Sequence, residues 1–106
     1  MGQSEALKVI KKFVKVLKQE GIAIDHVILY GSHARGNARA DSDIDVAVVS
    51  KNFGKDPIEE GMTLFRLAGK IDPRLEPVPI PVKIYKKDTW IPLIYEIREK
   101  GIELRI

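Results

Sequence analysis

The spacing of apolar residues near the start of the chain predicts an amphipathic helix. Apolar side chains recur there at intervals of three and four residues, which places them on one face of a helix. They are Leu7, Ile10, Phe13, Val14 and Leu17. Ser4 suits the N-cap position, and Gly21 suits the position just after the last turn. We therefore expect a helix over residues 5–20 that packs on a core.

Two shorter apolar stretches are typical of β-strands. Residues 27–30 (VILY) and 44–49 (IDVAVV) are rich in β-branched side chains and are bounded by polar residues. Because the connection over residues 32–42 is short, we expect the two strands to be neighbours in one sheet, in either direction. A tight turn at Gly31 is expected to open a short helix at Ser32.

The second half of the chain predicts a helix, a strand and another helix. Residues 56–59 (DPIE) form a capping-box pattern with proline at the first helical position, so a helix should run to about Lys70. Prolines at every second position of residues 75–82 remove N–H donors from one edge only, which predicts an edge strand. Asp88 or Thr89 can cap a helix over residues 90–100, and residues 102–106 should be extended.

Composition narrows the class of protein. A chain of 106 residues is the size of one domain, so we expect residues 1–106 to form a single domain. The 44% hydrophobic content argues against disorder, and the absence of cysteine excludes disulfides and thiolate metal sites. No apolar stretch approaches the roughly 20 residues that cross a bilayer, and no signal peptide is recognisable. We expect a cytoplasmic protein without a membrane partner.

Five lysines form a stripe on the first predicted helix, opposite its apolar face. They are Lys8, Lys11, Lys12, Lys15 and Lys18. Such stripes more often keep a helix face solvated than bind nucleic acid, and the net charge of +3 is mild, so the solvated face is the favoured interpretation. Nucleic-acid binding stays as the less favoured alternative.

The connection between the two predicted strands carries candidate chemistry. Asp43 and Asp45 are two positions apart at a strand entrance, so both carboxylates should leave one face and share a cation. Mg²⁺ prefers oxygen ligands and is commonly held by carboxylates together with substrate phosphates. Gly31 would let the backbone approach a phosphate, and Ser32 adds a hydroxyl and an N–H donor. These residues predict a site for a metal-bound triphosphate.

These residues also carry a resemblance to a known family. Residues 31–36 (Gly-Ser-x-Ala-Arg-Gly), followed by residues 42–45 (Ser-Asp-Ile-Asp), resemble the signature of the minimal nucleotidyltransferases of the DNA polymerase beta superfamily. The resemblance implies an α/β (α+β) fold of the polymerase beta palm type, a small mixed sheet with helices mainly on one side. It also implies Mg²⁺-dependent transfer of a nucleoside monophosphate from an NTP to an acceptor hydroxyl, with two ions expected.

The same resemblance assigns roles to individual residues. Gly31 and Ser32 would hold the triphosphate, and Asp43 and Asp45 would ligate the metal. Family members place a third carboxylate on a neighbouring strand, where it helps to bind metal and activate the acceptor. Glu76 is the candidate here, although the family usually has an aspartate in an apolar strand at this point.

The other polar residues of the motif and the aromatic residues near the end of the sequence have less specific assignments. Arg35 is equally suited to contacting a phosphate and to tying the short helix to the sheet through a carboxylate. His33 occupies a variable position of the motif and is expected at the surface. The aromatic residues are expected to be packing anchors rather than platforms for a base; they are Tyr85, Trp90 and Tyr95.

The resemblance extends to MntA-like antitoxins of HEPN/MNT toxin–antitoxin pairs. It implies a separately encoded helical HEPN-type protein as the partner and acceptor, with AMP moved from ATP. The short chain has no evident acceptor-binding module, so a protein acceptor is favoured over a small molecule or an RNA end. The alternative is a non-catalytic nucleotide-binding module that neutralises its partner by covering it. A homo-oligomer is compatible with both interpretations.

Overall fold

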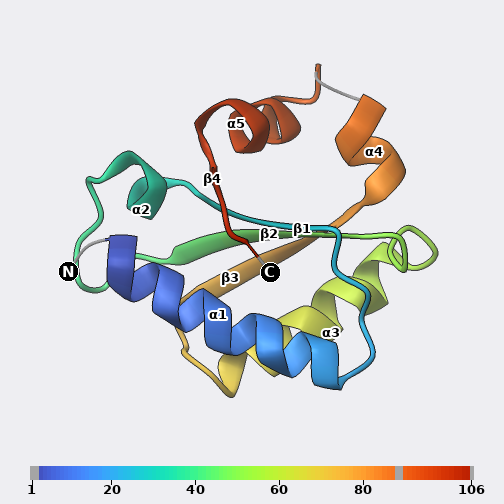
Figure 1. The fold of residues 1–106 in the computed structure, drawn as a ribbon, viewed down its shortest axis with the longest axis horizontal. Helices are drawn as coiled ribbons and strands as arrows, with labels where there is room; N and C mark the ends of the chain where they lie inside the picture. Colours follow the sequence, from blue (N-terminus) through green and yellow to red (C-terminus); the bar gives the residue numbers. More distant parts are fainter. Residues whose placement is uncertain (1–2, 88–89, 106) are drawn as a thin grey trace.

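The computed structural model describes residues 3–87 and 90–105, which form a four-stranded mixed sheet with helices on both faces (Figure 1). In chain order the elements are α1 (Gln3–Gln19), β1 (His26–Tyr30), α2 (Ser32–Arg35), β2 (Ile44–Ser50), α3 (Pro57–Gly69), β3 (Leu75–Pro81), α4 (Val82–Lys87), α5 (Pro92–Lys100) and β4 (Ile102–Glu103). The expected mixed α/β architecture is confirmed. No helix among these residues is both long and apolar enough to cross a membrane.

The sheet has the order β3-β2-β1-β4, so β2 is central and β3 lies at an edge. β1 pairs antiparallel with β2 and with β4, and β2 pairs parallel with β3. The strands over residues 27–30 and 44–49 are therefore neighbours, as expected, and their direction is antiparallel. The edge position expected for the proline-rich strand is also confirmed.

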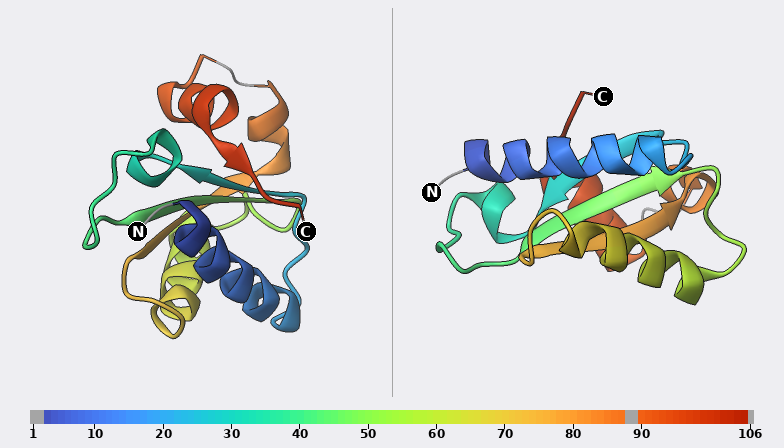
Figure 2. Two further views of the ribbon diagram at one scale, coloured as in Figure 1. Left: turned by 60° about the vertical axis from the view of Figure 1, so that its left-hand side comes forward. Right: turned by 90° about the horizontal axis from the view of Figure 1, so that it is seen from below.

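Two apolar clusters cover opposite faces of the sheet. α1 and α3 lie against one face, and α4 and α5 lie on the other (Figures 1 and 2). Successive residues of β2 alternate between them, so Val46 and Val48 join the first cluster while Ala47 and Val49 join the second. The expectation of helices mainly on one side holds for the two longest helices only. An apolar central strand needs cover on both faces, and α5 supplies the second layer.

α1 ends as its sequence predicts. Gly21 has a φ of 82°, and the N–H of Ile22 donates to the carbonyl of Leu17 at 3.1 Å. The N–H of Gly21 donates to the carbonyl of Lys18 at 3.1 Å, which completes a Schellman motif. The beginning differs from the prediction, since Ser4 lies inside the helix and is not its N-cap.

The N-terminus of α3 confirms one half of the expected capping box. The Asp56 side chain accepts a hydrogen bond from the N–H of Glu59 at 3.1 Å, with Pro57 at the first helical position. The reciprocal acceptor is Glu60 rather than Glu59. Its carboxylate accepts from the N–H groups of residues 54–56, and these bonds lower the pKa of Glu60.

The last part of the chain departs from several expectations. α5 begins at Pro92, two residues later than predicted, and the expected caps Asp88 and Thr89 lie outside the described residues. Val82 begins α4 instead of extending the strand before it. β2 ends at Ser50, whose register partner is Pro81, so no residue of β2 remains to pair with Val82.

The aromatic residues near the C-terminus differ in their surroundings. Trp90 is 79% exposed and Tyr95 is 54% exposed, so the expected packing role is wrong for both. Tyr85 fits that role better. Its ring lies 5.2 Å from the ring of His26 between centroids, and the guanidinium carbon of Arg98 lies 5.5 Å from its centroid.

Candidate functional site

A row of polar side chains crosses the sheet where β2 begins. The register pairs Asp45 of β2 with Tyr30 of β1 on one side and with Glu76 of β3 on the other. Directly paired residues place their side chains on the same face of a sheet. This is the face that carries α5, because Ala47 and Val49 follow Asp45 at intervals of two and pack there. The sheet thus brings the sequence-predicted Asp45 and Glu76 side by side, with Asp43 just before the strand.

Electrostatics show that negative charge is concentrated at this row. Burial is the largest cause of the raised pKa of Asp45. Three neighbouring carboxylates raise this pKa further, each by less than burial does; they are Asp43, Glu76 and Glu96. Burial also raises the pKa of Tyr30 to about 12, and the charge of Asp45 contributes to that shift. A cation placed among these carboxylates would offset the repulsion that contributes to the raised pKa of Asp45.

Gly31 is fitted closely to Asp45. Its φ of 77° lies in the left-handed region that favours glycine. A Cβ atom at this position would overlap Oδ2 of Asp45, so any other residue would push the carboxylate away. Ser32 follows at once as the first residue of α2 and is half-buried. The glycine corner predicted from the sequence therefore lies directly against the predicted metal ligand.

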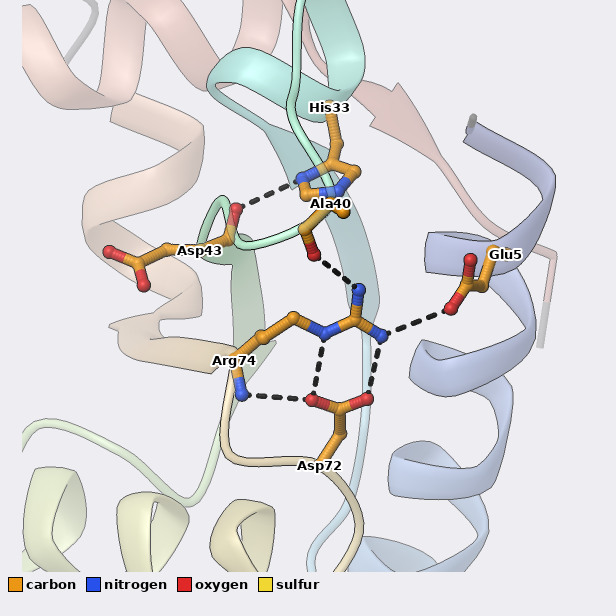
Figure 3. A network of polar contacts seen from close by, with 6 residues as sticks. All are labelled: Glu5, His33, Ala40, Asp43, Asp72 and Arg74. Carbon is orange, nitrogen blue, oxygen red and sulfur yellow. Dashed lines mark hydrogen bonds and ion pairs between the residues drawn. The ribbon is translucent and has the colours of Figure 1, made fainter. Parts of the chain in front are cut away.

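His33 corrects the sequence interpretation. It is only 3% exposed, not at the surface as expected. Its Nδ1 lies 2.9 Å from the backbone oxygen of Asp43, and since a carbonyl oxygen can only accept, Nδ1 carries the proton (Figure 3). His33 thereby fixes the backbone of Asp43 against α2.

Arg35 contacts a carboxylate in this structure. Its Nη1 lies 3.4 Å from Oε2 of Glu96, with both side chains partly exposed. Of the two alternatives left open by the sequence, the carboxylate contact occurs here, but the carboxylate belongs to α5 and not to the sheet. Glu96 is a residue that sequence reasoning missed, because only the packing of α5 brings it to this end of the sheet.

Asp72, another acidic residue at this end of the sheet, is neutralised by an ion pair with Arg74. Arg74 donates to both carboxylate oxygens of Asp72, at 3.1 and 2.8 Å, and Nη2 also donates to Glu5 of α1 at 3.2 Å (Figure 3). The hydrogen bonds from Arg74 lower the pKa of Asp72. Asp72, four residues before Glu76, is therefore occupied by a structural ion pair and is absent from the row.

The donor set suits a hard cation. Asp43, Asp45 and Glu76 offer only carboxylate oxygens, which Mg²⁺ prefers. Among residues 3–87 and 90–105, however, no three His, Cys, Asp or Glu side chains are grouped so that they could hold a metal as they stand. Glu76 and Asp43 are exposed, so their side chains have room to turn toward Asp45.

Comparison with protein families gives one match over most of the chain. The family described as Polymerase beta, Nucleotidyltransferase matches residues 11–105. A candidate protein adenylyltransferase of Methanocaldococcus jannaschii is 31% identical over 104 residues, which cover 94% of this chain and 99% of that protein. The match to both extends well beyond the motif of the central connection.

Solved structures share the fold. A candidate nucleotidyltransferase from Sulfolobus solfataricus aligns with a TM-score of 0.67 and 19% identity, over 95% of this chain and 80% of that one. A toxin–antitoxin structure with AMP-PNP aligns with a TM-score of 0.66 and 24% identity, over 90% and 71%. A mutant of the toxin–antitoxin MntA-HpeT aligns with a TM-score of 0.65 and 22% identity, over 90% of this chain and 71% of that one. At these identities the likeness concerns the fold alone.

Proposed function

The chain belongs to the polymerase beta nucleotidyltransferase family, and from this premise we propose that it is a single-domain enzyme moving AMP from ATP to a hydroxyl group of a partner protein. Transfer of a nucleotide is the activity of the family. The choice of ATP and of a protein acceptor is supported by the M. jannaschii relative, which is described as a protein adenylyltransferase.

One observation carries the assignment of the site. Asp45 lies in a row with Tyr30 and Glu76, and its pKa is raised by burial and by the surrounding carboxylates. No ion pair with a cationic side chain is formed by Asp43, Asp45 or Glu76 within the described part of the chain. Uncompensated carboxylates cost free energy in a folded protein, and a bound cation would offset that cost.

We assign Asp43, Asp45 and Glu76 as the residues that hold Mg²⁺, two ions being expected. Bound there, the metal would neutralise the oxygens of the triphosphate and of the attacking group. Asp45 is set against Gly31, so the ligands of the metal and the corner assigned to the phosphates are adjacent. The close approach that glycine permits is what a phosphate needs from the backbone.

The proposed reaction uses these residues as follows. The acceptor hydroxyl oxygen attacks the α-phosphorus in line, the bond to the α–β bridging oxygen breaks, and pyrophosphate leaves. Glu76, exposed at the edge of the sheet, takes the proton of the attacking hydroxyl. Ser32 and Gly31 hold the triphosphate, and the protein contributes chiefly by positioning the two reactants.

Arg35 is assigned to the nucleotide as well. Its side chain is 48% exposed and its Nη1 lies 3.4 Å from Oε2 of Glu96, which is a long, solvent-screened ion pair. A triphosphate beside Gly31 offers more negative charge than one carboxylate. Arg35 therefore exchanges Glu96 for phosphate oxygens when the nucleotide binds.

The proposed partner is a helical HEPN-type toxin encoded separately, with this chain as its antitoxin. The support is the fold likeness to the toxin–antitoxin MntA-HpeT and to the toxin–antitoxin with AMP-PNP. The expected nucleotide, ATP, agrees with the AMP-PNP of the second structure. The rival proposal is a non-catalytic module that neutralises the toxin by complex formation alone.

The experiment uses ATP labelled on the α- or the γ-phosphate, Mg²⁺ and the protein encoded next to this chain. We expect label on the partner from α-labelled ATP only, since nucleotidyl transfer retains the α-phosphate. Asp43→Asn should abolish labelling, and Asp41→Asn, an exposed aspartate two residues away, is the matched control that should retain it. Equal labelling by Asp43→Asn and the parent would remove catalysis at this site.

The rival is separated by neutralisation of the toxin. If complex formation alone protects cells, the Asp43→Ala/Asp45→Ala double variant protects as well as the parent. Our proposal predicts that this variant still binds the partner but fails to protect.

A further inference from the structure

α3 carries an apolar stripe that nothing in the described chain covers. Ile58 is 77% exposed, Met62 is 64% exposed and Phe65 is 60% exposed. Their spacing of four and three residues puts them on one face of the helix. The buried residues of α3 lie on a different face, against the sheet and α1; they are Leu64, Leu67 and Ala68. α3 forms an outer layer of the molecule, so its far side is open (Figure 2).

Three large apolar side chains in line on an open helix face mark a surface for another protein. We infer that this stripe packs against the same stripe of a second copy of the chain, with the two α3 helices antiparallel about a two-fold axis at Met62. The inference is independent of the proposed nucleotide chemistry, because α3 takes no part in the row of carboxylates.

The charges beside the stripe select a second copy as the occupant. Glu59 and Arg66 are exposed and seven residues apart, so they lie two turns apart on the same flank of the stripe. Neither side chain forms an ion pair with any other residue that the structure describes. Opposite charges at the two ends of one flank make a surface that is complementary to itself when reversed.

The two-fold arrangement uses this pattern. When one helix is rotated onto an antiparallel copy about an axis through Met62, the charged flanks of both copies fall on the same side with their ends exchanged. Glu59 of each copy then lies beside Arg66 of the other, and Ile58 of each lies near Phe65 of the other. A parallel pair would put the two flanks on opposite sides and leave these charges apart, so the antiparallel pair is favoured.

The size of the stripe sets the expected strength. A stable interface buries roughly 800 Å² on each partner, and one helix face covers less than this. The two ion pairs are exposed and contribute more to orientation than to affinity. We therefore expect a dimer that dissociates on dilution rather than a permanent one.

Sedimentation velocity of the full chain, from about 1 to about 500 µM, tests the inference. The parent should shift from monomer to dimer with concentration. Met62→Glu, which places two like charges at the axis, should remain monomeric. Circular dichroism checks that each variant keeps its helix content, and all the substitutions lie at exposed positions.

Charge reversal tests the orientation. Glu59→Arg and Arg66→Glu should each weaken dimerisation at least tenfold, because each brings two like-charged pairs together. The double variant Glu59→Arg/Arg66→Glu should restore it. An equimolar mixture of the two single variants should also form a heterodimer, since each then supplies the charges that the other lacks.

Four outcomes would overturn the inference. The parent could stay monomeric at every concentration, or Met62→Glu could leave the dimer intact. The two single charge variants could stay monomeric when mixed. Finally, the chain could be a monomer whose binding to a different partner protein is lost in Met62→Glu. The last result would assign the stripe to that partner instead of a second copy.

Discussion

Two aspartates at the same end of the sheet have opposite environments. Asp72 accepts three hydrogen bonds from Arg74, which lower its pKa, whereas the pKa of Asp45 is raised by burial and by neighbouring carboxylates. Figure 3 shows the first group as a closed network, with the carboxylate of Asp43 directed away from it. The difference separates an acid used for structure from the acids that we propose to bind a metal ion.

Arg74 explains why Asp72 is neutralised and Asp45 is not. It connects the segment before β3 to Glu5 of α1 and to the carbonyl of Ala40, so its donors are already used for folding. Its hydrogen bonds to Asp72 and Glu5 also raise its own pKa, and it stays charged. No comparable cation is supplied to Asp45 by the described residues; among them His33 alone acts to lower its pKa.

The largest expected effect comes from removing the negative charge of each aspartate by substitution with asparagine. Asp45→Asn should lower nucleotidyl transfer about a thousandfold, because one of the proposed charged ligands of the metal is lost, and should leave stability unchanged or higher. Asp72→Asn should leave transfer within a few-fold of the parent but lower stability. Assays of label transfer and urea unfolding measure both. If Asp45→Asn destabilises the fold as much as Asp72→Asn, the comparison fails.

A steric change at the glycine corner should have the next largest effect. Gly31→Ala strains a positive φ and pushes against Oδ2 of Asp45, so we expect transfer to fall about a hundredfold. Gly36→Ala is the matched control, because Gly36 has a φ of 81° but no atom within 4 Å of its added Cβ. It should cost about 1 kcal/mol of stability and little activity. Equal loss of activity in both variants would mean that only backbone strain matters.

On the structural side, Arg74 should matter for stability and not for chemistry directly. Arg74→Ala leaves Asp72 partly buried without its partner, so we expect unfolding to become easier by about 2 kcal/mol. Arg74→Lys should recover only part of this, because a lysine cannot contact both oxygens of Asp72 in one plane. Urea titration measures all three proteins. Full recovery by lysine would show that charge alone, not geometry, holds this corner.

The smallest effect is the pH dependence, and its sign differs between the two aspartates. The pKa of Asp45 is raised in the folded state, so its favourable contribution is present below the unfolded pKa and is lost as pH rises through the folded pKa. For Asp72 the contribution is present above the unfolded pKa and is lost as pH falls through the folded pKa.

Urea midpoints of the parent and the two asparagine variants, measured from about pH 3 to pH 7, separate these cases. The advantage of Asp45→Asn over the parent should grow with rising pH, and the deficit of Asp72→Asn should shrink as pH falls. Parallel curves for the three proteins would contradict the assigned environments.

The sequence predicted what depends on local spacing. The sequence predicts that Asp43, Asp45 and Gly31 belong together, because a strand places alternate side chains on one face and a glycine at its end marks a tight turn. Glu76 is a candidate through the resemblance to the family, and the alternating prolines predict the edge strand that carries it. These features need only the geometry of one or two elements.

What the sequence did not predict depends on long-range packing. Glu96 reaches the site only because α5 covers the second face of the sheet, and Tyr30 joins the row only through the register of β1 with β2. The sequence predicts a surface position for His33, because it is a lone histidine at a variable position of the motif. Its partner in the structure is a backbone carbonyl, which carries no sequence signal. Side chains placed by tertiary contacts have no fixed spacing to detect.

The central claim, that the row around Asp45 is kept for a cation, is tested most directly by calorimetric titration of Mg²⁺ in the presence of AMP-PNP. We predict that the parent and Asp41→Asn bind the ion with similar affinity and that Asp45→Asn binds at least tenfold more weakly. Equal binding by the parent and Asp45→Asn would contradict the account.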